Sequence, residues 1–259
     1  MNRKIGGVPD YVPVEQARHM PGLRIAFTKG LNGPWGVGAR ALFDIKGIDY
    51  VAVPQIAGDP NSALKEWTGQ SSAPVAMLND DRPRALWSEM IVLAEQLQPE
   101  PRLIPTDEDQ RIEMFGLCHE ICGDDGLGWN MRLLLFAEQR KEQFTTYSTL
   151  HSKYDSPVEE QHARGRLNSI LDALARRLEA QARAGSRYFV GDRLSPVDLY
   201  WAGFSNLVVT IDEEVCHNSD FYRGLAASLT PYLDKPVAKI LLDHRDFVVR
   251  EHFPLPIAF

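Results

Sequence analysis

Several features that define secreted or membrane proteins are missing from this 259-residue sequence. It has only three cysteines, too few and too unevenly spaced for the disulfide framework of a small secreted domain. No apolar run reaches the roughly 18 residues that a membrane-spanning helix needs. Residues 6–10 do not form the apolar segment of a signal peptide. We therefore expect a cytoplasmic protein that makes no contact with a membrane.

An excess of positive charge is also missing. The formal net charge is -7 and the isoelectric point is near 5.5, so the overall field repels polyanions and no nucleic-acid partner is expected. Hydrophobic residues make up 44% of the chain, which is ordinary for a soluble globular protein. An anionic ligand would therefore need a local binding site.

The sequence lacks the usual metal and phosphate motifs. Cys118, His119 and Cys122 fall within one predicted helix, but a tetrahedral zinc site needs four ligands and no second pair with suitable spacing follows. Residues 30–33 form a glycine-rich turn without the lysine and hydroxyl of a phosphate-binding loop. We predict no metal site.

The pattern sharpens after residue 22 into a strand, a helix and a second strand. Residues 23–27 are strand-like, Pro34 opens a helix with apolar residues at helical spacing that ends near Lys46, and residues 50–53 form the second strand. A connection of this kind is expected to be right-handed, with the two strands parallel. Residues 1–22 carry three prolines and are expected to form an arm laid on the surface or left partly mobile.

A hairpin and a helix follow. Residues 74–78 are strand-like, a turn covers residues 79–81, and a short return strand is expected near residues 84–86. A helix then begins near Ser88 and ends before Pro99. Between the second strand and residue 74, an irregular stretch is expected around residues 58–60.

Everything after a proline-rich linker at residues 99–107 is predicted to be helical. Capping signals at Ser156 and at Ser195, the latter with Asp198 three residues on, mark two helix starts. We therefore predict an arm at 1–22, a first domain at 23–98 and an all-helical domain at 108–259. The apolar tail at residues 253–259 is expected to pack on the surface.

Four local segments resemble those of the cytosolic glutathione transferases. They are residues 34–42, with Arg40 at a basic position usual in that family, residues 73–75, residues 86–89 and residues 188–198. The resemblance covers roughly residues 23 to 245 and rests on the combined pattern. It implies an α+β, thioredoxin-like first domain followed by an all-α second domain. It also implies a homodimer with glutathione as co-substrate.

The resemblance also assigns groups that would hold glutathione. A cis peptide bond before Pro74 would turn the backbone of Ala73 outward to pair with the cysteinyl part of the ligand. Ser88, at a helix start, would bind the γ-glutamyl carboxylate, with Trp87 beside it. Gln70 and Trp35 complete the predicted binding residues. The alternative is that Ser88 is only a helix cap in a domain that binds nothing.

The residue that would activate the glutathione thiol is not obvious. Much of the family carries serine or cysteine at the positions of Gly33 and Gly36, so covalent chemistry by a protein cysteine at this helix start is not expected. Asn32 is our first candidate donor to the sulfur, and Thr28 or the backbone N–H groups of Trp35 and Gly36 are the others. The alternative for Asn32 is a turn asparagine bonded to nearby backbone.

A second substrate would lie against the helical domain. Its candidate pocket residues are Phe115, Cys118, Trp129 and Met131, and the alternative for each is ordinary core packing. The sequence thus predicts a glutathione transferase-like enzyme that stabilises the thiolate for attack on a hydrophobic electrophile. A non-catalytic protein that binds glutathione or a hydrophobic ligand, or an interaction domain on the same fold, remains the alternative.

Overall fold

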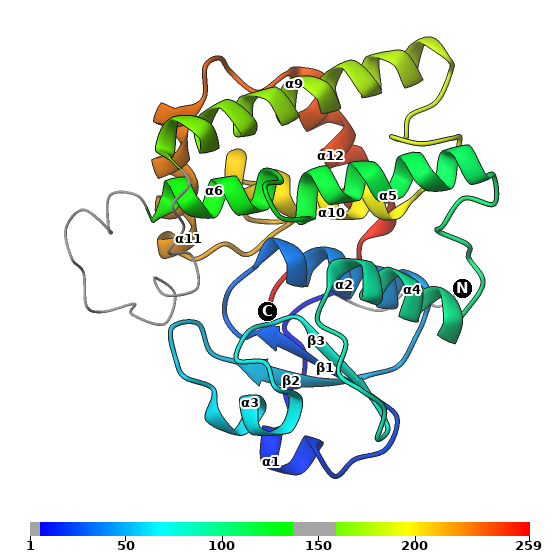
Figure 1. Cartoon of the computed structure of the whole chain (residues 1–259), viewed down its shortest axis with the longest axis vertical. Coiled ribbons are helices and arrows are strands. Elements are labelled where there is room, and N and C mark those ends of the chain that lie inside the picture. The colour runs from blue at the N-terminus through cyan, green and yellow to red at the C-terminus, as the bar shows by residue number, and fades with distance from the viewer. Residues whose placement is uncertain (1–5, 137–158) are drawn as a thin grey trace.

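A three-stranded mixed sheet organises the N-terminal domain of the computed structural model, which describes residues 6–136 and 159–259. The strand order is β2-β1-β3, with β2 parallel and β3 antiparallel to β1. Helices α2 and α4 cover one face of the sheet, and α1 and α3 lie at the other (Figure 1). The elements are α1 (Val14–Ala17), β1 (Leu23–Thr28), α2 (Pro34–Ile45), β2 (Val51–Gln55), α3 (Ser62–Thr68), β3 (Val75–Leu78) and α4 (Trp87–Leu97).

Alternation along β1 gives the sheet two cores. Ile25 and Phe27 face α2 and α4 and belong to the main core, whereas Ala26 packs with Val53 and Leu64 in a smaller core on the α1 and α3 side. Successive side chains of a strand point to opposite faces, which produces this division. The predicted thioredoxin-like arrangement of the first domain is confirmed.

Three local features of the first domain bear on the predictions. Residues 58–60 are irregular as predicted, but α3, a helix of seven residues that follows them, was not predicted. The predicted return strand is reduced to one bridge between Ala76 and Arg84. The described part of the arm lies on the protein, one of the two arrangements predicted for it, and it contains α1 and a bridge from Tyr11 to Ala52. Short helices and single bridges carry little periodic signal in a sequence.

The rest of the described chain is helical. Its elements are α5 (Glu108–Cys122), α6 (Leu127–Leu135), α9 (Glu160–Arg183), α10 (Pro196–Val208), α11 (Asp220–Leu229), the short 3-10 helix η2 (Thr230–Tyr232) and α12 (Lys239–His252). The capping box at the start of α10 is confirmed, because the Asp198 carboxylate accepts the backbone N–H of Ser195 at 2.8 Å. The signal predicted at Ser156 lies outside the described residues.

The two domains pack closely where α2 meets α10. A Cβ atom at Gly38 would lie 2.4 Å from the ring of Tyr200, so only glycine permits this approach. The tail at residues 253–259 is buried and does not lie on the surface as predicted. Phe259 is 6% exposed and packs edge-on against Phe27 at 5.5 Å, because the junction offers an apolar surface that the sequence pattern does not reveal.

No helix in the described ranges is both long enough and apolar enough to cross a membrane.

Candidate functional site

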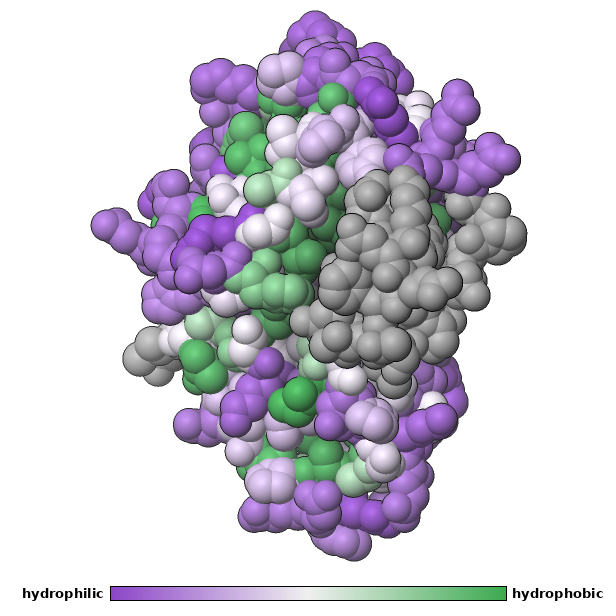
Figure 2. All heavy atoms as spheres, turned by 90° about the vertical axis from the view of Figure 1, so that its left-hand side faces the viewer, coloured by the Kyte–Doolittle hydropathy of each residue, from purple (hydrophilic) through white to green (hydrophobic). Residues whose placement is uncertain are grey.

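The carboxyl ends of β1 and β2 and the start of α2 lie on the same side of the molecule, at the left in Figure 1. Figure 2 turns this side to the viewer and shows hydrophobic side chains gathered midway between two hydrophilic ends. The edge of a sheet beyond its parallel strand ends is a common place for a ligand. A ligand site is therefore expected at this edge.

Ala73 presents an unused stretch of backbone at this edge. The bond from Ala73 to Pro74 is cis, as predicted. Ala26 pairs with Val75, so continuing the same register puts Ala73 across from Thr28. Within residues 6–136 and 159–259, neither the N–H nor the C=O of Ala73 has a hydrogen-bond partner in the protein. Such groups can pair with an extended ligand as a neighbouring strand would.

The first turn of α4 offers a second set of free groups. Ser88 is the second residue of the helix and is only partly buried. Its hydroxyl and its backbone N–H have no acceptor or donor partner in the described part of the chain. The Glu89 carboxylate accepts the preceding N–H groups of Ala85 and Leu86, at 3.0 and 3.1 Å. Glu89 thus caps the start of α4. The hydroxyl and the N–H of Ser88 remain available to bind a carboxylate.

Trp87 links this helix start to the helical domain. Its ring centroid lies 6.4 Å from the rings of both Phe115 and His119 on α5. Its backbone C=O accepts the hydroxyl of Tyr200 at 3.3 Å. The Trp87 side chain therefore forms part of a wall between the domains, next to Ser88.

Thr28 is already engaged by the protein. Its hydroxyl donates to Oε1 of Gln55 at 2.8 Å, and a hydroxyl has one hydrogen to donate. Gln55 in turn donates to the backbone C=O of Ile56 and Ser71, so its amide orientation is fixed. Thr28 therefore reaches the site only as an acceptor, which does not fit the predicted role of donor to sulfur.

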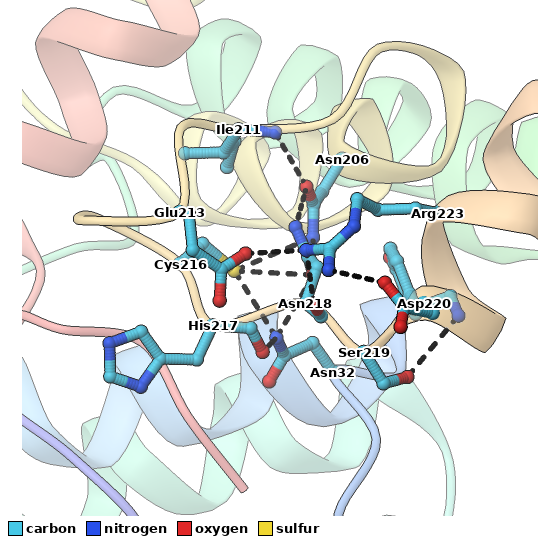
Figure 3. A network of polar contacts seen from close by, with 11 residues as sticks. Asn32, Asn206, Ile211, Glu213, Cys216, His217, Asn218, Ser219, Asp220 and Arg223 are labelled. Atoms are coloured by element: carbon cyan, nitrogen blue, oxygen red, sulfur yellow. Dashed lines mark hydrogen bonds and ion pairs between the residues drawn. The ribbon is translucent and has the colours of Figure 1, made fainter.

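Asn32 is also engaged, as Figure 3 shows. Its side-chain nitrogen lies 2.7 Å from the C=O of His217, 3.1 Å from Oδ1 of Asn218 and 3.3 Å from Sγ of Cys216. Three acceptors in the loop between α10 and α11 thus share its two hydrogens, and Asn32 is only 3% exposed. The geometry does not support the predicted role of Asn32 as thiol donor and matches a structural asparagine.

The thiol of Cys216 belongs to the same buried network. Asn206 of α10 also donates toward its sulfur at 3.5 Å. Burial, reinforced by the charge of Glu213, raises the pKa of Cys216 to about 12. This thiol is therefore neutral at physiological pH and serves the contact between the β1–α2 turn and the helical domain.

The start of α2 keeps two backbone donors. Pro34 has no N–H, and the N–H groups of Trp35 and Gly36 have no acceptor in the described residues. The indole of Trp35 donates to the C=O of Cys122 at 3.0 Å, so its side chain joins the domains. Gln70 precedes Ala73 by three residues and bonds through its backbone to Thr68, which leaves its side chain without a described partner.

The predicted substrate-pocket residues divide into two pairs. Phe115 and Trp129 are partly buried, and Phe115 contacts the Trp87 wall. Cys118 and Met131 are both 0% exposed in the core, so the prediction that they line a pocket is wrong. Both side chains face inward from their helices. Apolar residues in the core and apolar residues lining a pocket have the same helical spacing, so the sequence does not distinguish the two kinds of position.

His119 is a site neighbour that the sequence analysis considered only as a metal ligand. It is exposed, and a Cβ atom at Gly123 would lie 2.4 Å from its ring, so that glycine gives the ring its place beside Trp87.

The described residues contain no group of three or more potential metal ligands. A depression of about 340 Å³ between α1 and α3 is lined by none of the predicted site residues.

Comparison with known proteins gives the class of fold. No family model matches the chain, and no curated protein matches it by sequence. Solved structures do match. A glutathione S-transferase domain-containing protein of Marinobacter aquaeolei superposes with a TM-score of 0.61 at 16% identity, over 88% of this chain and 98% of that one.

Two further glutathione S-transferases cover nearly the whole chain. That of Methylobacterium radiotolerans, in complex with glutathione sulfonate, has a TM-score of 0.59 at 18% identity over 92% of this chain and 95% of that one. That of Methylobacillus flagellatus, with glutathione bound, has a TM-score of 0.60 at 12% identity over 90% and 100%. The chain therefore has the glutathione S-transferase fold, a thioredoxin-like domain followed by a helical domain.

Proposed function

We propose that this protein binds glutathione along Ala73, with the γ-glutamyl carboxylate at the first turn of α4. The observation that carries the proposal is the pair of unused groups at this edge, the backbone of Ala73 and the hydroxyl and N–H of Ser88. An extended peptide paired with Ala73 gains main-chain hydrogen bonds, and a helix N-terminus favours a negative charge. The glutathione-bound relatives of the same fold support this choice of ligand.

Conjugation of glutathione to a hydrophobic electrophile is the second candidate function. The free N–H groups of Trp35 and Gly36 favour it, because donors at a helix start stabilise a nearby thiolate. Each unit by which the thiol pKa falls requires about 1.4 kcal/mol of preferential stabilisation. With Thr28 and Asn32 committed elsewhere, backbone donors alone would supply it, and we expect slow turnover. Phe115 and Trp129 are the remaining candidates to contact the electrophile.

We extend the proposal to a homodimer. Leu86 and Ile112 are apolar and are 61% and 68% exposed, and the partly buried Trp87 and Phe115 join them into one patch across α4 and α5. An exposed apolar patch of this kind commonly marks an interface. Analytical ultracentrifugation of the wild type and of Ile112→Glu tests it, and a monomeric wild type would contradict it.

The three buried, unpaired cysteines favour a reducing compartment, and we propose the cytoplasm.

Isothermal calorimetry with glutathione tests the proposed function. We expect saturable binding that is competed by S-methylglutathione and is weakened by Ser88→Ala. The matched control is Ser169→Ala, an exposed serine of α9 far along the chain from the site. If neither binding heat nor competition is seen up to about 10 mM glutathione, the proposal is rejected. That limit corresponds to a binding free energy weaker than about 3 kcal/mol.

A further inference from the structure

The depression between α1 and α3 shares no lining residue with the proposed glutathione site. The N-terminal arm forms one side of it, through Tyr11, Val14 and Glu15, and the end of β2 and the start of α3 form the other. Its volume of about 340 Å³ falls in the range of small-molecule sites, which begins at about 300 Å³. We call this depression the arm pocket.

Much of the wall of the arm pocket is apolar. Pro54, Ile56 and Leu64 line it opposite Val14 of the arm. Ile56 is 46% exposed, although it is a large apolar side chain. An apolar group of a ligand would cover this side chain and remove its surface from water, which stabilises the complex.

A rigid turn shapes the side of the arm pocket that leads into α3. Asn61 has a φ of 49°, in the left-handed region, and its N–H donates to the Asp59 carboxylate at 2.7 Å. Its side-chain amide donates to the C=O of Ile56 and of Asp59 and accepts the N–H of Ile56. Because these bonds fix the turn in the absence of a ligand, binding there requires little ordering of the chain.

Two charged groups of opposite sign line the arm pocket without an ion-pair partner. Lys29 lies over the ring of Tyr11, with Nζ 5.8 Å from the ring centroid, a contact that favours this position of the ammonium group. Within residues 6–136 and 159–259, the side chains of Lys29 and Glu15 make no hydrogen bond or ion pair, with each other or with other residues. The third charged group of the lining, Asp59, already accepts the N–H of Asn61.

This charge pattern selects the class of ligand. A ligand with only a negative charge would meet the carboxylates of Glu15 and Asp59, and one with only a positive charge would meet Lys29. A zwitterion can pair with both signs. We propose that the arm pocket binds an α-amino acid with an apolar side chain, its carboxylate at Lys29, its ammonium group at Glu15 and its side chain against Ile56.

Amide chemical shifts of the ¹⁵N-labelled full chain test the proposal, with L-phenylalanine as the probe. We expect the N–H signals of Ile56 and Ala63 to shift with one saturation curve, half-saturated near about 1 mM. L-phenylalaninamide lacks the carboxylate and N-acetyl-L-phenylalanine lacks the ammonium group. Each should bind about threefold more weakly, because an exposed ion pair changes an affinity by a factor of about two to five.

Two variants assign the charges. Lys29→Met should bring phenylalanine and phenylalaninamide to equal affinity, because the carboxylate then has no partner. Glu15→Gln should do the same for phenylalanine and its N-acetyl derivative. The matched control is Lys65→Met, an exposed lysine of α3 that does not line the arm pocket, and it should keep both preferences.

Three results would overturn the proposal. The first is the absence of saturable shifts at Ile56 and Ala63 up to about 20 mM phenylalanine. The second is equal affinity of the wild type for the three probes, or a preference that survives in Lys29→Met. The third is loss of phenylalanine binding in saturating glutathione, which would make the arm pocket part of the glutathione site. The wild-type titrations need no variant, so they decide the question even if a variant fails to fold, and glutathione binding at Ala73 and Ser88 is measured independently of them.

Discussion

The two helix starts that border the candidate site differ in how the protein uses its polar groups. At α4, Glu89 caps the helix and leaves Ser88 unengaged, and the nearby backbone of Ala73 is free as well. At α2, the neighbouring side chains Thr28 and Asn32 are hydrogen-bonded into the fold. The groups that would hold glutathione are available, whereas the side chains expected to activate its thiol are not.

This difference separates binding from chemistry within one fold. A helix N-terminus with an unpaired hydroxyl can bind a carboxylate without any further residue. Activation of a thiol needs a donor aimed at sulfur. Here the side-chain candidates Thr28 and Asn32 donate within the fold, and of the predicted donors only the backbone N–H groups of Trp35 and Gly36 remain free among the described residues. The free groups of Ala73 and Ser88 therefore support the proposed ligand more strongly than any described side chain supports the reaction.

The largest expected effect is on stability, from Asn32→Ala. This substitution removes the side-chain amide that donates to three buried acceptors, on His217, Asn218 and Cys216. We expect a loss of about 2–4 kcal/mol in the free energy of unfolding. Urea denaturation measures it, with the exposed Gln96→Ala of α4 as control. Unchanged stability together with a raised pKa of the bound thiol would instead make Asn32 the activating residue.

The next effect is on ligand affinity, from Ser88→Asp. A carboxylate in the first turn of α4 repels the γ-glutamyl carboxylate, and we expect the dissociation constant for glutathione to rise at least about tenfold. Calorimetry compares it with Ser169→Asp, which adds the same charge on α9. Equal affinities in the two variants would remove α4 from the site.

Alkaline pH probes the network around Asn32 through Cys216. An unfolded thiol ionises near pH 8.5 but the folded one only at about 12, so between these values the unfolded state loses its proton first and stability falls as pH rises. Cys216→Ser removes this contribution and should reduce the slope of unfolding free energy by up to about 1.4 kcal/mol per pH unit above pH 9. Parallel slopes in the two proteins would mean that Cys216 is not buried as described.

Thr28→Val gives the smallest effect. It leaves Oε1 of Gln55 without its donor, and we expect a loss of about 1 kcal/mol in stability with the affinity for glutathione changed less than twofold. Denaturation and calorimetry on the same preparations measure both quantities. A tenfold loss of affinity at unchanged stability would show that the hydroxyl serves the ligand.

The sequence predicted the parts of this molecule that depend on local pattern. The unit from β1 to β2 and the capping box at Ser195 follow from residue spacing, and both are present. The engagement of Asn32 depends on Cys216 and Asn218, more than 180 residues away, which no local pattern reports. Cys118 shows the same limit, because helical spacing does not tell a core position from a pocket wall.

The position of glutathione along Ala73 and Ser88 is the claim on which the rest depends, and amide chemical shifts test it most directly. In a ¹⁵N-labelled, deuterated sample titrated with glutathione, we expect the N–H signals of Ala73 and Ser88 to shift with the same saturation curve. The signal of Gly116, exposed on α5, should stay in place. Saturable shifts confined to other residues, with Ala73 and Ser88 unmoved, would contradict the proposed site.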